Sequence, residues 1–279
     1  MGFPLFRLPQ LALLEVIQLQ NPFEVFYVSK TSTRAKHIVR TMRRKVHTVQ
    51  LYLNTKFELK VQDNQNPNDV FSFAVGRNIP LVTGRRLEGV LDLFKHFQDV
   101  FSISLDFLYI DAAWFNSSYL NLLEFAANTP FPTISIAIER MEKLDQLLRA
   151  LTLPLQKLTI EVWYSRSIGP NLDMPMQSIQ CETLQIFSVY CVQVPLIMIF
   201  DFVTAEFLRI DMPNDDLNVF LKSWKQGKTH QRMKNFKLFT TRRFDLSTIF
   251  DGLELISEDP DVLNFDSGKI GVKGIDGKL

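Results

Sequence analysis

The stretch that decides the fold is residues 3–40, FPLFRLPQLALLEVIQLQNPFEVFYVSKTSTRAKHIVR. It predicts three short helices in a row, because each begins with its own start signal. Leu8-Pro9 opens the first, since proline is favoured at the first helical position. Asn21-Pro22 opens the second in the same way, with Asn21 as its N-cap. Three hydroxyl side chains can cap the third helix: Thr31, Ser32 and Thr33.

This segment is unusually apolar for its size. A three-helix unit this small cannot bury much apolar surface by itself. It nevertheless carries more apolar residues than one small core needs: Phe3, Leu5, Phe6, Leu8, Leu11, Leu13, Val16, Ile17, Leu19, Phe23, Val25, Phe26 and Val28. We therefore expect part of this surface to pack on another protein.

The same residues resemble an F-box, the motif that binds the Skp adaptor of SCF-type ubiquitin ligases, and look like its nematode-expanded branch. The resemblance rests on Leu8-Pro9, the aliphatic stretch 13–19, the run 21–26, and 28–30 with Ser32. It implies that docking on the adaptor buries seven side chains: Leu8, Pro9, Val16, Ile17, Pro22, Val25 and Phe26.

Two positions depart from the family pattern. Thr31 stands where many F-boxes carry an aliphatic residue, and Ala35 stands where they carry a tryptophan. Retention of adaptor binding is therefore an open question at this point. An unrelated helical cap on a larger domain is the alternative to the F-box.

Bulk properties favour a folded intracellular protein. The chain has 279 residues, of which 46% are hydrophobic and 22% charged, typical of a globular protein with room for a small module and one sizeable domain. Cys181 and Cys191 predict two reduced thiols in a cytoplasmic or nuclear protein. We expect no signal peptide and no membrane span, since Pro195 and Asp201 interrupt the most apolar stretch, 192–207.

Charge gives no argument for nucleic acid or membrane as a partner. The net charge is only +1, which excludes a global electrostatic attraction. Residues 30–45 hold seven basic side chains and no acid, which could form a phosphate-binding helix. The segment has no aromatic residue on which bases could stack, so the solvated face of the third helix is the favoured interpretation.

The sequence predicts no catalytic, cofactor-binding or metal site. Gly227-Lys228 and Gly268-Lys269 lack the upstream glycine of a phosphate loop. A Gly-x-Ser-x-Gly elbow is absent, and the four histidines form no His-Glu-x-x-His frame. An enzyme of unrecognised type stays an alternative.

After the helices, residues 46–53 and 57–61 alternate with period two and predict a hairpin, and 71–75 a third strand. Leu87 to Phe97 predicts a helix leading into the rest of the chain.

Beyond residue 98 a short apolar pattern recurs. It occupies six sets of positions: Val100/Ile103/Leu105, Phe131/Ile134/Ile136, Leu155/Leu158/Ile160, Cys181/Leu184/Ile186, Ala205/Leu208/Ile210 and Met233/Phe236/Leu238. Their period is that of a leucine-rich repeat, in which stacked units bury a shared core. We expect an irregular leucine-rich-repeat-like β/α array over about 87–255, with an ordinary α/β sandwich as the alternative.

Helices are predicted between these strands. Residues 141–151 and 215–226 each place leucines on one helical face, and Gly227 suits the C-cap of the second. Residues 119–128 and 246–253 are further candidates. The chain is thus of the α+β or α/β class.

Residues 216–227, DLNVFLKSWKQG, resemble the type-2 F-box-associated domain. This resemblance implies a domain that recruits a protein substrate. We therefore divide the chain into an F-box over 1–45 and an associated domain over 46–279, comprising a hairpin (46–75), the array, and a tail or last hairpin (257–279).

The residues between the core positions of each strand should face the opposite side of the sheet, the side that solenoids use to bind partners. Those we assign to substrate binding are Glu161, Gln185, Phe187, Arg209, Lys237 and Phe239. The predicted function is an SCF substrate-recognition adaptor, whose partners are the Skp-family adaptor and an unidentified substrate. The alternative is a free-standing interaction scaffold.

Overall fold

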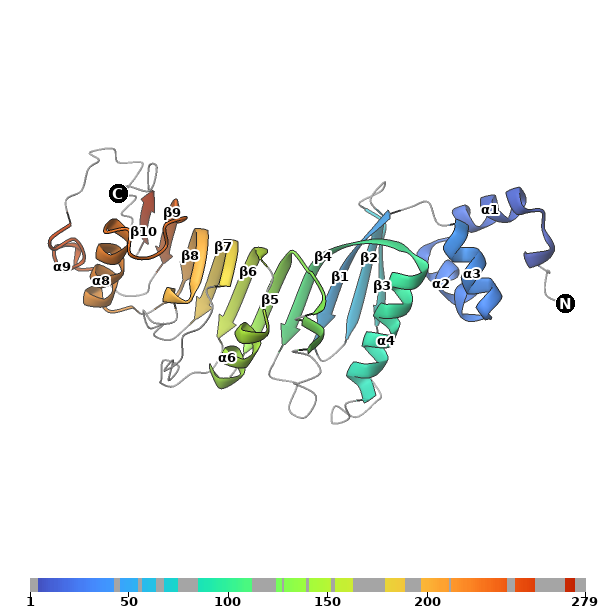
Figure 1. Ribbon diagram of the computed structural model, residues 1–279, viewed down its shortest axis with the longest axis horizontal. Helices are drawn as coiled ribbons and strands as arrows, with labels where there is room; N and C mark the ends of the chain where they lie inside the picture. Colours follow the sequence, from blue (N-terminus) through green and yellow to red (C-terminus); the bar gives the residue numbers. More distant parts are fainter. Residues whose placement is uncertain are drawn as a thin grey trace. The chain divides into compact units, whose positions relative to one another are not determined.

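A computed structural model describes fourteen stretches of the chain, and every structural statement below concerns them: 5–42, 46–54, 57–63, 68–74, 85–111, 124–126, 128–138, 141–151, 154–162, 179–188, 197–210, 212–239, 244–253 and 269–273. Figure 1 labels the helices and strands of the chain. The chain divides into two compact units, unit 1 (Met1–Leu108) and unit 2 (Tyr109–Leu279).

Unit 1 begins with a 3₁₀ turn, Leu5–Arg7, and the three predicted helices, α1 (Gln10–Leu19), α2 (Pro22–Lys30) and α3 (Thr33–Met42). Asn21 caps α2 as predicted, accepting from the Glu24 backbone N–H while the Glu24 carboxylate accepts from that of Asn21. Such a capping box satisfies two backbone donors at once. Pro9 is the N-cap of α1 and not its first helical residue, which corrects the predicted start by one position.

The predicted hairpin and third strand are also present in unit 1. β1 (Val46–Leu53) pairs antiparallel with β2 (Glu58–Asp63), and β2 pairs with β3 (Val70–Ala74). The helix expected over 87–97 is α4 (Arg85–Val100), followed by β4 (Ser102–Asp111). The strand order in this part of the sheet is β4-β1-β2-β3.

The core of unit 1 joins the N-terminal helices to the elements that follow them. Phe26 of α2 stacks on Phe97 of α4 with ring centroids 5.1 Å apart, and Phe73 of β3 lies 5.3 Å from Phe26. All three rings are buried. The division into compact units falls after Leu108. The boundary at residue 45 between the F-box and the associated domain stays a prediction.

Unit 2 contains five strands that run parallel in chain order: β5 (Thr133–Ile138), β6 (Leu155–Val162), β7 (Ile179–Ser188), β8 (Phe200–Leu208) and β9 (Asn235–Phe239). A sixth strand, β10 (Lys269–Lys273), pairs antiparallel with β9. It lies within residues 257–279, for which the sequence allowed either a tail or a last hairpin.

Helices follow three of the strands. α6 (Met141–Ala150) follows β5, α8 (Asn214–Lys225) follows β8, and the short α9 (Leu246–Ile249) follows β9. α9 is shorter than the expected 246–253 because its C-cap is already Phe250. The helix predicted over 119–128 falls largely outside the described residues.

Gly227 ends α8 as predicted. Its φ is +66°, a left-handed conformation that glycine adopts without a Cβ clash. The Gly227 N–H donates to the Trp224 carbonyl and the Lys228 N–H to the Ser223 carbonyl. These two bonds form a Schellman motif, which satisfies carbonyls that the helix end leaves open.

The strand registers confirm four of the six apolar sets and correct two. Leu158, Leu184 and Phe236 occupy matching positions, and their partner in β8 is Ala205. The buried set of β8 is therefore Phe202/Ala205/Phe207, three residues earlier than predicted. In the first set, Val100 ends α4, and the fully buried residues of β4 are Leu108 and Ile110.

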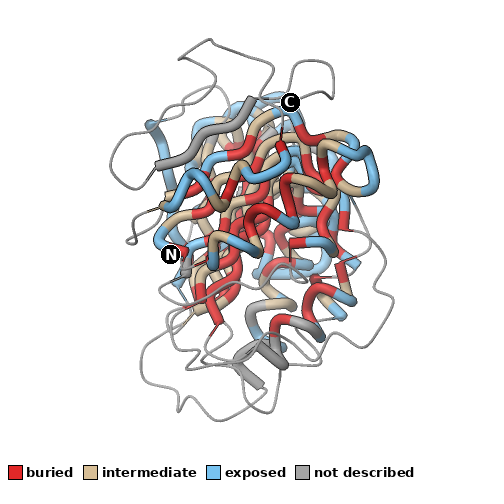
Figure 2. Tube along the Cα trace, turned by 90° about the vertical axis from the view of Figure 1, so that its left-hand side faces the viewer, coloured by how far each residue is buried: buried red, intermediate tan, exposed pale blue. Residues whose placement is uncertain are grey.

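Buried and less buried residues both occur along the chain (Figure 2). They alternate in β8 and β9, whereas five of the six residues of β5 are buried. In β8 four residues are buried, Phe200, Phe202, Ala205 and Phe207, and the residues between them are partly exposed. Because successive side chains point to opposite faces of a strand, one face of the unit 2 sheet forms the core. The other face carries the residues considered next.

Candidate protein-binding surfaces

The N-terminal helices leave three large apolar side chains exposed. Leu11 and Leu19 of α1 are 78% and 85% exposed, and Tyr27 of α2 is 65% exposed. Side chains of this kind lose favourable burial when they face water. Leu11 and Leu19 are among the excess apolar residues that the sequence indicated, whereas Tyr27 is not.

The seven residues expected to contact an adaptor fall into two groups. Leu8 and Val16 are half-buried and Pro9 is exposed. Four others are buried: Ile17, Pro22, Val25 and Phe26. These four contribute to the core of unit 1, so an approaching partner would first meet their exposed neighbours. An adaptor contact stays a prediction for the whole set.

The Phe26 ring is closely packed in unit 1. Besides Phe97 and Phe73, its ring meets the imidazole of His96 edge-on at 5.2 Å, and Lys30 Nζ lies 5.2 Å above it. His96 Nε2 lies 2.8 Å from the hydroxyl of Ser29. Burial and the nearby Lys30 charge lower the pKa of His96, so the neutral imidazole is favoured beside this aromatic cluster.

Thr31 and Ala35, the two departures from the family pattern, have structural roles. Thr31 is the C-cap of α2, and its hydroxyl donates to the Val28 carbonyl at 2.8 Å. Ala35 is fully buried in α3, and its N–H donates to the Ser32 hydroxyl, one of the three predicted caps. A larger side chain at position 35 would need the surrounding packing to shift.

Part of the basic run is engaged within unit 1. Lys36 Nζ lies 2.7 Å from Asp99 Oδ2 of α4, and this hydrogen bond lowers the pKa of Asp99. Together with Lys30 above the Phe26 ring, this contact gives two of the seven basic residues a structural role. Residues 43–45 lie outside the described part of the chain.

Two parallel rows of side chains cross the face of the unit 2 sheet opposite the buried Ala205 and Phe207, which we call the outer face. At its β5 and β6 end three members of these rows are buried: Ser135, Thr159 and Ala137. The strand registers align the first, which we call the central row: Ser135, Thr159, Gln185, Glu206 and Lys237. Two residues further along each strand lies the second, the terminal row: Ala137, Glu161, Phe187, Leu208 and Phe239.

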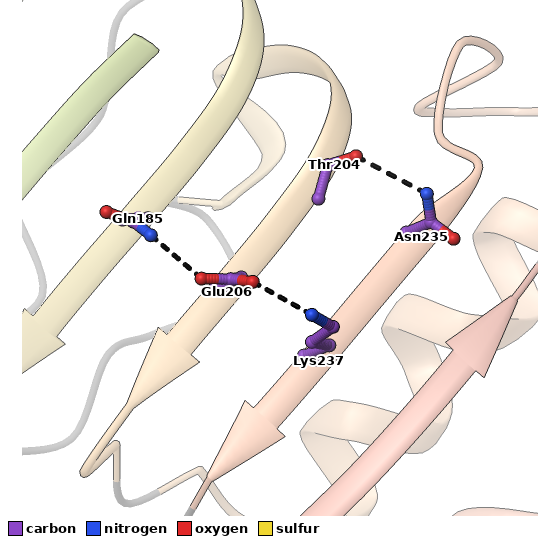
Figure 3. A network of polar contacts seen from close by, with 5 residues as sticks. All are labelled: Gln185, Thr204, Glu206, Asn235 and Lys237. Atoms are coloured by element: carbon purple, nitrogen blue, oxygen red, sulfur yellow. Dashed lines mark hydrogen bonds and ion pairs between the residues drawn. The ribbon is translucent and has the colours of Figure 1, made fainter.

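Hydrogen bonds link the central row (Figure 3). Gln185 Nε2 donates to Glu206 Oε2 at 2.8 Å, and Lys237 Nζ lies 3.0 Å from Glu206 Oε1. The bonds from Lys237 and Gln185 lower the pKa of Glu206, because they stabilise its charged form. Beside this row, Asn235 Nδ2 donates to Thr204 Oγ1 at 3.4 Å. The central row is thus held together by its own contacts.

The terminal row combines a carboxylate with apolar side chains. Burial, and then the charge of Asp111, raise the pKa of Glu161. The same two carboxylates and burial raise the pKa of Tyr109 to about 12. Phe187 is 37% exposed, and Leu208 and Phe239 are half-buried. Burial and the Asp111 charge both disfavour the charged form of Glu161 relative to that of an exposed carboxylate.

The structure brings five of the six predicted substrate-binding residues onto one face. Gln185 and Lys237 lie in the central row, and three lie in the terminal row: Glu161, Phe187 and Phe239. Arg209 does not belong to either row, because β8 ends at Leu208 and Arg209 has a φ of +59°. The sequence pattern did not single out Glu206 and Leu208, because the apolar set that it assigned to β8 begins three residues after the true one. The alternation of Phe200, Phe202 and Phe207 was the signal that could have corrected it.

Other classes of site gain no support from the described residues. They contain no group of three or more potential metal ligands, and none of their helices is long and apolar enough to cross a membrane. Cys181 is a free, buried thiol, and burial raises its pKa to about 12, which disfavours the reactive thiolate. Cys191 lies outside the described stretches.

Two segments of the chain match known protein families. Residues 5–47 match the family described as F-box domain, and residues 176–238 match the family described as F-box associated. The first match contains α1–α3, and the second contains β7, β8, α8 and most of β9. Searches of curated proteins and of solved structures found no match.

The fold is thus that of an α+β protein, in which a helical N-terminal segment precedes a mixed sheet with helices. Its N-terminal segment is similar to F-box domains, and residues 176–238 are similar to the F-box-associated family.

Proposed function

We propose that this chain is the substrate-recognition adaptor of an SCF-type ubiquitin ligase. In this role, α1 and α2 dock on a Skp-family adaptor, and the associated domain binds a protein substrate. The chain contributes proximity between substrate and ligase, while other subunits perform the transfer of ubiquitin. It acts inside the cell without a cofactor, and needs neither nucleic acid nor a membrane.

The observation that carries this proposal is the exposure of Leu11, Leu19 and Tyr27 within the F-box match. Three large apolar side chains exposed on so small a helical segment favour a surface that a partner covers. Leu8, Pro9 and Val16 are accessible enough to extend it. The other four residues expected to contact the adaptor are buried in unit 1: Ile17, Pro22, Val25 and Phe26.

The substrate-binding half of the proposal is supported by the outer face of the unit 2 sheet. Strands β5–β9 follow one another in chain order and bring equivalent positions into rows. We propose that this array is leucine-rich-repeat-like and that, as in solenoids, its outer rows form an extended binding surface.

The test is co-expression with a Skp-family adaptor, followed by size-exclusion chromatography and calorimetry. We expect a one-to-one complex. Leu11→Asp and Tyr27→Asp should each weaken it at least about tenfold, because they place a charge in an apolar contact. Val219→Asp is the matched control, since Val219 is 58% exposed on α8 of unit 2.

Phe26→Asp is a poor probe of docking, because it puts a charge into the core of unit 1. Deletion of residues 1–45 has the same weakness, since it removes the ring that covers Phe73 and Phe97. A folded wild-type chain that forms no complex, or a complex that survives both surface variants, would refute the docking surface and favour the free-standing scaffold.

A further inference from the structure

We propose that the terminal row is the substrate-docking surface, and that it takes an extended protein segment with a lysine or arginine followed by apolar side chains. The inference rests on the proposed substrate-binding function and deepens it by naming the chemistry of the segment. It also assigns separate tasks to the two ends of the row.

The apolar end of the row spans three neighbouring strands. Phe187, Leu208 and Phe239 are aligned by the registers of β7, β8 and β9. Phe187 is 37% exposed although it lies in the interior of the sheet, flanked by β6 and β8. Exposed aromatic side chains surrounded by half-buried apolar ones are typical anchors of protein interfaces. We infer that this end receives the apolar side chains of the segment.

The other end of the row carries negative charge. Glu161 neighbours Phe187 in the register, and Asp111 is close enough to raise the pKa of Glu161. The terminal row itself contains no basic residue. An incoming cation would stabilise the charged form of Glu161, which burial and the Asp111 charge disfavour. Charge complementarity thus selects a lysine or arginine side chain at this end.

In the central row the carboxylate of Glu206 already has two partners. Glu206 accepts from Gln185 and pairs with Lys237, so a ligand would have to break these contacts to use it. We infer that the central row serves as a rigid border of the docking surface. The selectivity for charge then lies with Glu161 and not with Glu206.

The strand spacing sets the pattern of the segment. Neighbouring strands lie about 4.8 Å apart, so Glu161 and Phe239 are about 14 Å apart across three strand spacings. Alternate residues of an extended segment repeat at about 7 Å. A segment crossing the strands therefore matches the row with a basic residue and apolar residues two and four positions from it.

The experiment is a selection from a displayed library of random ten-residue peptides against the full chain, with affinities then measured by fluorescence polarisation. We expect enrichment of a basic residue with apolar residues two and four positions away. Glu161→Lys should weaken the binding of an enriched peptide at least about tenfold by charge repulsion. Phe187→Ser should have an effect of similar size, because it removes an anchor.

Two matched controls separate the row from general surface effects. Val219→Ser removes an exposed apolar side chain from α8, and Asp215→Lys reverses an exposed charge on the same helix. Both should leave peptide affinity within about twofold, since neither residue lies in the row. Glu161→Gln, which keeps the shape of the side chain, covers the case in which Glu161→Lys fails to fold.

The outcomes are distinct. No enriched peptide, enriched peptides without a basic residue, or affinity unchanged in both Glu161 variants would overturn the proposal. A dimer in light scattering that Phe187→Ser dissociates would assign the row to a second copy of the chain instead. Peptide binding that persists in a chain unable to bind a Skp-family adaptor would retain the docking surface and remove the ligase role.

Discussion

Helices α1–α3 of unit 1 and strands β5–β9 of unit 2 differ in how their buried contacts are distributed. The helices bury a few residues around Phe26 and leave Leu11 and Leu19 exposed. The strands bury a repeated apolar row, and the central row on their outer face is linked by hydrogen bonds. A short helical segment depends on a few large contacts, whereas a parallel array spreads its stability over equivalent positions.

The largest expected effect tests the concentration of stability at Phe26. Phe26→Ala should lower the free energy of unfolding by about 3–5 kcal/mol, because it removes a buried ring from the cluster with Phe73 and Phe97. Denaturant titration of the full chain measures the change. Tyr27→Ala is the control, and should stay within about 0.5 kcal/mol, since its ring is exposed. Equal losses in the two variants would contradict the packing described for α2.

A second prediction concerns a buried polar contact of unit 2. Asn218 Nδ2 donates to the carbonyls of Ile249 at 2.8 Å and Asp251 at 2.9 Å. Asn218→Ala should destabilise the chain by about 1–3 kcal/mol, because a buried carbonyl loses its donor. Asn235→Ala should have a smaller effect, since Asn235 is half-buried and its bond to Thr204 is 3.4 Å long. The reverse order in thermal unfolding would show that burial is not the deciding factor.

A third prediction uses two glycines in helical contexts. Gly227→Ala should cost about 1–2 kcal/mol, because the residue has a left-handed φ although its surroundings leave room for a Cβ. Gly89→Ala, inside α4 with equal room, should instead stabilise by about 0.5–1 kcal/mol. Changes of the same sign in denaturant titrations would argue against the assigned end of α8 or against the course of α4.

The smallest effect is expected in the central row. The folded-state pKa of Glu206 lies below its ordinary value of 4.5. Its contribution to stability is therefore complete above pH 4.5 and is lost as the pH falls through the folded-state pKa. Glu206→Gln should be slightly less stable than wild type at pH 7. We expect this difference to vanish in acid, and a constant difference between pH 7 and pH 3 would contradict the assignment.

Local signals in the sequence were sufficient for most elements. Capping and proline signals located α1–α3 to within a residue, and the glycine at 227 located the end of α8. Period-two alternation located β1, β2 and β3. These features depend on interactions between residues close in sequence, and such interactions can be recognised without knowledge of the fold.

The binding surfaces were only partly predictable. Apolar character alone could not distinguish Phe26, which is buried, from Leu11, which is exposed, because both are apolar residues on adjacent helices. Likewise, the β8 pattern fitted Leu208 and Ile210 as well as the true set that contains Ala205 and Phe207. Register is decided by pairing with neighbouring strands, and those strands lie more than twenty residues away along the chain.

The sequence by itself determined the helical N-terminal segment, the succession of strands and the family resemblance. The tertiary structure alone decided which apolar side chains form a core and which polar ones meet. Glu206 meets Gln185 and Lys237 only because three strands, distant in sequence, lie side by side. Burial and cross-strand contacts arise from packing between distant segments, and no local pattern encodes them.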